Sequence, residues 1–224
     1  MNFRAARNAV LDAARRLLTL SLTHGTSGNV STRVAAGLAI TPTGVPVDDL
    51  APEDIAILSD DGVPHRGERR APSSEWRMHA AIYQARPEVR AIVHGHSPAA
   101  TAVACLGREI PPFHYMIAIA GGDSIRCARY ATFGTDQLAR YAVDALVDRQ
   151  ACLLARHGML ALGSDLDRAL SVAEEVEFLS DLYLRLLPLG PPALLSREDM
   201  EAVLEGFRQY GQPAAQVIFP HGTS

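Results

Sequence analysis

The apolar residues of this chain recur with two different periods, and segments of the two kinds alternate. Residues 3–22 have apolar positions at helical spacing, such as Val10 and Ala14, and Asn2 stands before them as the expected N-cap. The same period predicts helices at 72–86, from Ser97-Pro98 onward, and at 135–148, 165–186 and 196–210. Short apolar runs predict strands at 89–94, 151–155 and 159–162, and several short strands separated by turns are expected over 29–58.

This alternation of strands and helices predicts an α/β domain in which helices cover a sheet. The connecting segments are short, and the sequence has no internal repeat or low-complexity segment. We therefore expect one domain over residues 1–224, in which the tail 212–224 has no assigned role. Ser73 or Ser74 is expected to cap the second helix, and Ser196 with Asp199 resembles a capping box for the last one.

Composition and charge narrow the class of protein. Of the 224 residues, 48% are hydrophobic and 21% are charged, as is typical of a globular protein with a substantial core. The net charge of -4 and the pI near 6.0 argue against nucleic acid as the main partner. No apolar stretch approaches the roughly 20 residues that span a bilayer. The N-terminus lacks the apolar core of a signal peptide, and the three cysteines form no CxxC pair. We expect a cytoplasmic protein that binds neither nucleic acid nor membranes.

Lysine is absent, because all 21 basic residues are arginine. Lysine is the side chain that forms Schiff bases with carbonyl substrates, and it is also the phosphate-binding residue of P-loop enzymes. The chain can perform neither of these functions with a side chain. If it activates a carbonyl group, a metal ion is the expected electrophile.

Two short sequences near strand ends could hold such a metal ion. His94-Gly95-His96 follows an apolar run, and residues two apart in an extended chain point to the same side. His157 follows the run at 151–155, so the three imidazoles would converge if the two strands were neighbours. Three histidines with one open position describe a catalytic zinc site. Taken one at a time, these histidines could equally be polar residues of ordinary loops.

Glu75 is the candidate acid/base, just after Ser73-Ser74 in the first turn of an expected helix. A carboxylate at this place usually complements the helix dipole. It could instead serve as a general base, or as a fourth metal ligand that yields to substrate. His79 lies four residues further on, where it could pair with Glu75 on the helix, and it is not assigned to the metal.

Three segments could bind an anion through small polar side chains and exposed backbone N–H groups. They are Thr26-Ser27-Gly28-Asn29, Thr43-Gly44 and Ser73-Ser74. Each of them could also be a plain turn, because turns are rich in these residue types.

Seven short sequences occur in a set order along the chain. They are Ser27-Gly28-Asn29-Val30-Ser31, Ile40-Thr41-Pro42-Thr43-Gly44, Pro72-Ser73-Ser74-Glu75, His94-Gly95-His96, His114-Tyr115-Met116-Ile117, Tyr130-Ala131-Thr132-Phe133-Gly134-Thr135 and His157-Gly158. In this order they resemble the class II aldolase/adducin family, over residues 1–210. The resemblance implies a three-layer α/β/α domain built on a predominantly antiparallel sheet.

The resemblance also implies roles for individual residues. The ligands of one Zn2+ per subunit would be His94, His96 and His157, joined by Glu75 when no substrate is bound. Glu75 would be the catalytic acid/base, and Tyr115 would assist at the aldehyde oxygen. The substrate phosphate would be held by Gly28, Asn29, Thr43, Gly44, Ser73 and Ser74, with Thr26 nearby, and the aldehyde end would be shaped by Phe133, Phe207 and Tyr210. In this family the active site lies between the subunits of a homotetramer.

The implied reaction is the reversible cleavage of a ketose 1-phosphate of the L-fuculose 1-phosphate type. Its products would be dihydroxyacetone phosphate and a small aldehyde such as L-lactaldehyde. Alternatives within the family are an aldolase for 5-deoxypentulose phosphates, a pentulose-phosphate 4-epimerase and a methylthioribulose-phosphate dehydratase. A zinc hydrolase and a non-enzymatic, adducin-like interaction domain are the remaining alternatives. Gly95 and Arg156 stand where a close relative has Asn and His, and both positions adjoin the expected metal.

Overall fold

A seven-stranded sheet forms the middle layer of the domain. The structure, a computed structural model, describes residues 2–209. The strands are β1 (Asn29–Val34), β2 (Gly37–Ile40), β3 (Ala56–Leu58), β4 (Ala91–Gly95), β5 (Cys127–Ala128), β6 (Ala151–Leu154) and β7 (Gly158–Gly163). They lie in the order β3-β2-β1-β4-β7-β6-β5. Neighbouring strands are antiparallel except for β5 and β6, which are parallel. The predicted, predominantly antiparallel sheet is confirmed.

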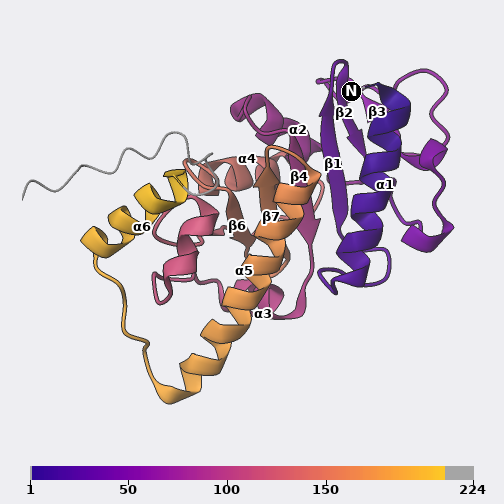
Figure 1. The fold of residues 1–224 in the computed structure, drawn as a ribbon. Helices are drawn as coiled ribbons and strands as arrows, with labels where there is room; N and C mark the ends of the chain where they lie inside the picture. Colours follow the sequence, from indigo (N-terminus) through magenta and orange to yellow (C-terminus); the bar gives the residue numbers. More distant parts are fainter. Residues whose placement is uncertain (1, 210–224) are drawn as a thin grey trace, which may run out of the picture.

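Helices cover both faces of this sheet (Figure 1). The α-helices are α1 (Phe3–Thr19), α2 (Trp76–Ala85), α3 (Pro98–Leu106), α4 (Asp136–Ala145), α5 (Leu166–Leu186) and α6 (Arg197–Gln209). Buried side chains of α1, α3 and α5 form one apolar cluster with the sheet, and those of α2 and α4 form a second cluster on the opposite face. The domain is therefore a three-layer α/β/α arrangement.

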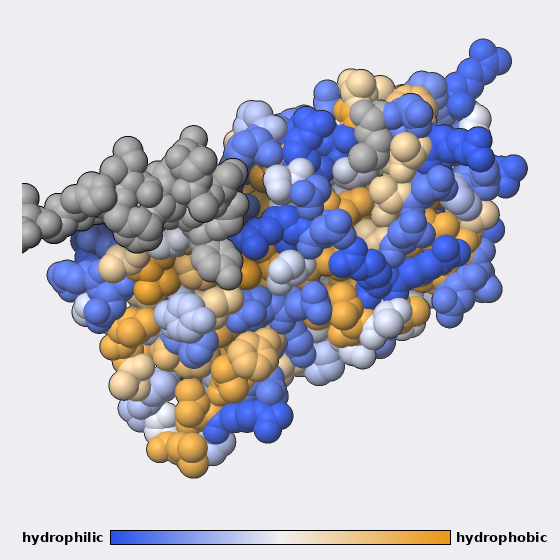
Figure 2. Space-filling view, in the orientation of Figure 1, coloured by the Kyte–Doolittle hydropathy of each residue, from blue (hydrophilic) through white to orange (hydrophobic). Residues whose placement is uncertain are grey.

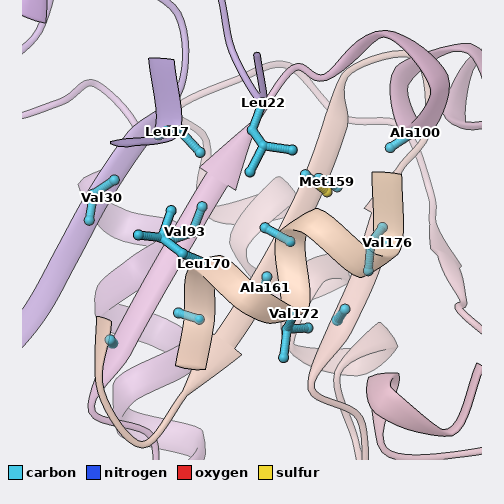
Figure 3. Close-up of a cluster of buried hydrophobic side chains, with 14 of the residues drawn as sticks. Leu17, Leu22, Val30, Val93, Ala100, Met159, Ala161, Leu170, Val172 and Val176 are labelled. Carbon is cyan, nitrogen blue, oxygen red and sulfur yellow. The ribbon is translucent and has the colours of Figure 1, made fainter. Parts of the chain in front are cut away.

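Alternation along the central strands supplies both apolar clusters. On β4, Val93 joins the cluster beneath α5 while its neighbour Ile92 joins the cluster beneath α2. On β7, Met159 and Leu160 divide in the same way. Figure 3 shows Val93 and Met159 on the first face, among side chains of α5 that include Leu170. Burial on both faces explains why these strands read as continuous apolar runs in the sequence.

Two helices, α1 and α6, begin at the capping residues that the sequence predicts. The Asn2 side chain accepts a hydrogen bond from the backbone N–H of Ala5 at 2.8 Å. At α6, the Asp199 backbone N–H donates to Ser196 Oγ at 3.0 Å, and the Ser196 N–H donates to the Asp199 carboxylate at 3.2 Å. The first helix ends at Thr19 rather than at residue 22, because Ser21 adopts a left-handed backbone with φ of 58°.

Some short elements were not predicted from the sequence. They are β5 and the 3-10 helices η1 (Val47–Asp49), η2 (Pro52–Asp54), η3 (Tyr115–Ala120) and η4 (Leu187–Leu189). Most are only two or three residues long, so they contain too few positions to show a hydrophobic period. No helix in residues 2–209 combines the length and the apolar character needed to cross a membrane.

Candidate metal centre and substrate cleft

Three imidazoles converge at one end of the central strands. β4 pairs with β7, with Gly95 opposite Met159, and His157 lies on the turn that leads into β7. The potential ligand atoms of His94, His96 and His157 all lie within 4.8 Å of one another. The sequence predicts this convergence if the strands before His94 and His157 are neighbours; in the sheet β4 and β6 are not adjacent, because β7 lies between them. The tight hairpin of β6 and β7 nevertheless brings His157 to the end of β4.

The donor set fits a divalent metal ion. Nε2 of His94 and Nε2 of His96 lie 3.0 Å apart, and two ligands of a tetrahedral zinc ion are separated by about 3.3 Å. The Glu75 carboxylate adjoins them, with Oε2 3.1 Å from His94 Nε2 and Oε1 3.4 Å from His157 Nε2. Oε1 is buried and has no hydrogen-bond partner within residues 2–209. A bound cation would compensate the crowded nitrogen lone pairs and this carboxylate oxygen.

Hydrogen bonds and charges set the protonation of the three imidazoles. Nδ1–H of His94 donates to the Met159 carbonyl oxygen at 2.8 Å, which leaves Nε2 facing the cluster. Burial alone would lower the pKa of His94, but the adjacent Glu75 carboxylate raises it above its ordinary value. Burial, together with positive charge on His94, lowers the pKa of His96 to about 3 and the pKa of His157 to about 4. Both are therefore neutral near pH 7, which is the metal-binding form of histidine.

Glu75 occupies the N-cap position of α2, and its carboxylate turns to the metal centre instead of capping the helix. Neither Ser73 nor Ser74 caps α2, contrary to the sequence prediction. The Ser73 N–H donates to the Thr41 carbonyl at 3.0 Å, which ties this segment to the chain after β2, and Ser73 Oγ accepts from the Glu75 N–H at 3.3 Å in the turn before the helix. Burial by itself would raise the pKa of Glu75, but the charge and hydrogen bond of His94 lower it below its ordinary value. Glu75 is therefore ionised near neutral pH.

A cleft of about 520 Å3 opens beside the metal centre. The residues of the site hypothesis that line it are Thr26, Gly28, Asn29, Thr43, Gly44, Ser73, Ser74, Glu75, His96, Phe133 and His157. The three candidate anion-binding segments thus line one cleft together with the candidate acid/base Glu75 and the candidate metal ligands His96 and His157. A cleft of this size is typical of small-molecule sites.

Gly28 shows why one of these segments can approach the metal centre so closely. Its φ of +77° is left-handed, and a Cβ atom there would lie 2.7 Å from Thr23 Oγ1 and 2.9 Å from the His94 carbonyl oxygen. Side chains other than hydrogen would both strain the backbone and collide with these atoms. The loop before β1 therefore needs glycine at this position.

Three residues of the site hypothesis are not in the cleft. Tyr115, at the start of η3, is 51% exposed, and Phe207 packs from α6 against the apolar cluster that contains α5. Neither of them lines the cleft. Tyr210 lies outside the described residues.

Tyr130 and Arg156, to which the sequence assigned no role, and Glu177, which the sequence did not single out, also lie near the site. Tyr130 and Arg156 line the cleft, and the Arg156 guanidinium lies 6.0 Å from the centre of the Tyr130 ring. Glu177 of α5 accepts hydrogen bonds from the backbone N–H groups of Ala99 and Ala100, both at 2.8 Å. This carboxylate caps α3, the helix that follows the His96 loop, and so anchors the loop from the opposite layer. Only the pairing of α3 with α5 reveals Glu177, because its sequence context is an ordinary helix.

A family model described as the class II aldolase and adducin N-terminal domain matches residues 8–184. The chain belongs to the class II aldolase and adducin family. It is 50% identical over 210 residues to a 5-methylthioribulose-1-phosphate/5-deoxyribulose-1-phosphate aldolase of Rhodospirillum rubrum, with 94% of each chain covered. It is 46% identical over 203 residues to the L-fuculose phosphate aldolase of Escherichia coli (strain K12), covering 90% of this chain and 94% of that protein.

Solved structures of class II aldolases share the fold. A structure of L-fuculose 1-phosphate aldolase superposes with a TM-score of 0.87 at 39% identity, covering 91% of this chain and 96% of the other. The expected fold and the expected family are thus both confirmed. The chain is a class II aldolase, a metal-dependent aldehyde-lyase, and the histidine cluster is the place where its divalent metal can bind.

Proposed function

We propose that this class II aldolase uses zinc to cleave a ketose 1-phosphate, of the L-fuculose 1-phosphate type, into dihydroxyacetone phosphate and a small aldehyde such as L-lactaldehyde. One observation carries the proposal. A single cleft contains an ionised, buried carboxylate, metal-binding imidazoles and three polar segments suited to a phosphate. A scaffold domain or a simple hydrolase would not need all three together.

The chemistry follows from the residues of the cleft. A divalent metal held by His94, His96 and His157 supplies, when bound, a Lewis acid for the ketone oxygen of the substrate. Glu75 exchanges a proton with the substrate carbon that carries the negative charge after the carbon–carbon bond breaks. In synthesis the ionised carboxylate takes this proton, and the aldehyde oxygen gains one as it becomes a hydroxyl group. In cleavage that hydroxyl group loses its proton as the aldehyde forms, and the Glu75 carboxyl group delivers one to the carbon, so that no net proton is gained or lost. No lysine is available for a covalent alternative.

The phosphate is expected to bind at a distance from the bond that breaks. Gly28 and Gly44 both have left-handed backbones, with φ of +77° and +68°, and such turns expose neighbouring N–H groups to an anion. Ser73 and Ser74 line the cleft just before α2, and the Ser73 hydroxyl, which accepts from the Glu75 N–H at 3.3 Å, keeps its hydrogen for a ligand. Contacts of this kind hold the substrate in register while the reaction occurs elsewhere.

The substrate assay is the direct test of this function. Metal-analysed protein is incubated with L-fuculose 1-phosphate and with other ketose 1-phosphates, and dihydroxyacetone phosphate is measured with a coupled enzyme. We expect release from at least one substrate, and we expect a chelator to abolish it and added zinc to restore it. Metal-loaded protein that releases nothing from any of them would contradict the aldolase and favour the epimerase or the dehydratase.

A second candidate substrate is a 5-deoxypentulose 1-phosphate. It is favoured because this chain is 50% identical to the 5-methylthioribulose-1-phosphate/5-deoxyribulose-1-phosphate aldolase of Rhodospirillum rubrum and 46% identical to the L-fuculose phosphate aldolase of Escherichia coli (strain K12). Both substrates give dihydroxyacetone phosphate, but their aldehydes differ. Cleavage of 5-deoxyribulose 1-phosphate leaves acetaldehyde, whereas L-fuculose 1-phosphate leaves lactaldehyde. The ratio of kcat/KM for the two substrates therefore decides between them.

We also propose a cytoplasmic homotetramer with active sites between subunits, in which Tyr115 completes a neighbouring subunit's site; the assignment of Phe207 and Tyr210 to the aldehyde end stays a prediction. Tyr115 is exposed and outside the cleft of its own chain. Figure 2 shows apolar residues gathered over the end of α5 and the segment that leads to α6. In this region Leu189 is 83% exposed and Leu194 is 55% exposed, as is typical of surfaces that bind another protein.

The three cysteines are free thiols, which supports the cytoplasm, a reducing compartment, as the location of the protein.

Light scattering on the metal-loaded protein tests the assembly. The expected mass is four times the 24.1 kDa of one chain. Dilution that dissociates the assembly should remove activity as well, because each site would lose the residues of its neighbour. A fully active monomer would contradict the shared site.

A further inference from the structure

A chain of buried polar side chains leads from Glu75 through the layer between β1 and α2. Asn29 and Ser31 lie on β1, and His79 and Tyr83 lie one turn apart on α2. All four are buried, and Ser31 and His79 are fully buried. On the same face of the sheet, His94 of β4 lies opposite Asn29, whereas Ile92 of β4 and Leu160 and Leu162 of β7 are apolar, so away from the metal centre the polar layer is confined to β1 and α2.

Four hydrogen bonds connect the chain without interruption. Asn29 Nδ2 donates to Glu75 Oε2 at 3.0 Å, and His79 Nε2 lies 2.6 Å from Asn29 Oδ1. Ser31 Oγ lies 2.7 Å from His79 Nδ1 and 2.9 Å from the Tyr83 hydroxyl. Each distance is that of a well-formed hydrogen bond.

The direction of every bond follows from the carboxylate. An ionised Glu75 can only accept, so Asn29 must present its NH2 group there and its carbonyl oxygen to His79. Nε2 of His79 must then carry a hydrogen. Burial lowers the pKa of His79 to about 3, so the ring is neutral and Nδ1 is an acceptor. Ser31 therefore donates to Nδ1.

The far end of the chain is fixed by the same reasoning. With its hydrogen committed to His79, Ser31 Oγ accepts from the Tyr83 hydroxyl. Burial raises the pKa of Tyr83, so its hydroxyl stays protonated and remains a donor. The donors of all four bonds thus point in one direction, toward Glu75.

We propose that Asn29 and His79 are positioning residues for Glu75, with Ser31 and Tyr83 holding the tautomer of His79. This proposal rests on the acid/base role proposed for Glu75. A flipped Asn29 amide would bring its oxygen against Glu75 Oε2, and the donor from His79 prevents this flip. Oε2 is thereby anchored, and Oε1, which has no hydrogen-bond partner within residues 2–209, is left to the metal centre and the substrate.

Variants of His79 and its neighbours test the effect on turnover. His79→Phe keeps the ring shape but removes the donor to Asn29, and we expect kcat to fall by about 10-fold to 100-fold, as is common for partners of ligating or catalytic groups. The KM for the ketose 1-phosphate and the metal content should stay close to the wild-type values. Ser31→Ala removes the donor to Nδ1 with less change in volume, and it should lower kcat less than His79→Phe. Tyr83→Phe removes only the donor furthest from Glu75 and leaves the bond between Ser31 and His79 intact, so it should lower kcat less than Ser31→Ala does.

A double-mutant cycle separates positioning from a loss of packing. In the Glu75→Gln background, His79→Phe should cause little further loss of kcat, because its effect passes through the carboxylate. Equal losses of kcat in both backgrounds, or wild-type kcat for a folded, metal-loaded His79→Phe protein, would overturn the proposal while leaving the aldolase function in place.

The tautomer of His79 is a readout that does not depend on turnover. In zinc-loaded protein with 15N-labelled histidine, solid-state NMR should show His79 neutral with hydrogen on Nε2, its signals being assigned by their loss in His79→Phe. Ser31→Ala should shift the population toward the other tautomer. A ring protonated on Nδ1 in the wild type would overturn the proposal even in an active enzyme. The expected tautomer in a protein without aldolase activity would support the hydrogen-bond chain and would instead contradict the proposed function.

Discussion

Replacing Glu75 by Gln should lower kcat for dihydroxyacetone phosphate release by about 10²-fold to 10⁴-fold, the usual contribution of a general acid/base. The substitution keeps the shape of the side chain and removes its charge. Its amide oxygen can still accept from Asn29, so the hydrogen-bond chain survives. The three histidines remain to bind the metal, and the phosphate segments are unchanged, so metal content and KM should change little.

Steady-state kinetics with parallel metal analysis measure this effect. Glu174→Gln, on the exposed face of α5, is the matched control for removing one carboxylate from the protein. Wild-type turnover in Glu75→Gln would show that Glu75 is not the acid/base. A Glu75→Gln protein that has lost its metal would show that Glu75 acts mainly as a metal ligand. Its position allows this role, because Oε1 and Oε2 of Glu75 lie close to the imidazoles.

Replacing His94 by Ala should remove the metal and the activity together. His94 is fully buried, is held by Met159 and lies nearest to both His96 and Glu75, so no other side chain can take its place. Loss of a Lewis acid worth about 4 kcal/mol corresponds to a decrease in kcat of about 10³-fold.

Zinc content by mass spectrometry and turnover of the same sample test this prediction. His65→Ala is a suitable control, because His65 is exposed and belongs to no metal-binding cluster in residues 2–209. If the His94→Ala protein is active but holds no metal, the reaction does not depend on the metal. A variant that keeps one zinc per chain would show that His96, His157 and Glu75 suffice as ligands.

Much of the fold could be predicted because its signals are local. The buried strands β4, β6 and β7 are short runs of apolar residues, and α1 and α5 repeat apolar residues every three or four positions. The caps of α1 and α6 are contacts between residues three apart, which a sequence displays directly. The two-residue strand β5 could not be found in this way, because it exists only through its parallel pairing with β6.

The sequence by itself determined the residue types of the site: histidines two apart at a strand end, a carboxylate in the first turn of an expected helix, and small polar residues at turns. Only the tertiary structure decided how they meet. The insertion of β7 between β4 and β6 brings His157 to His94. The bond from Ser73 to Thr41 holds the segment before α2 against the chain after β2, and the Glu75 carboxylate lies beside His94. The packing of α2 on β1 joins His79 to Asn29. These contacts link residues tens of positions apart, so no local pattern can specify them; they follow from which apolar faces pack together.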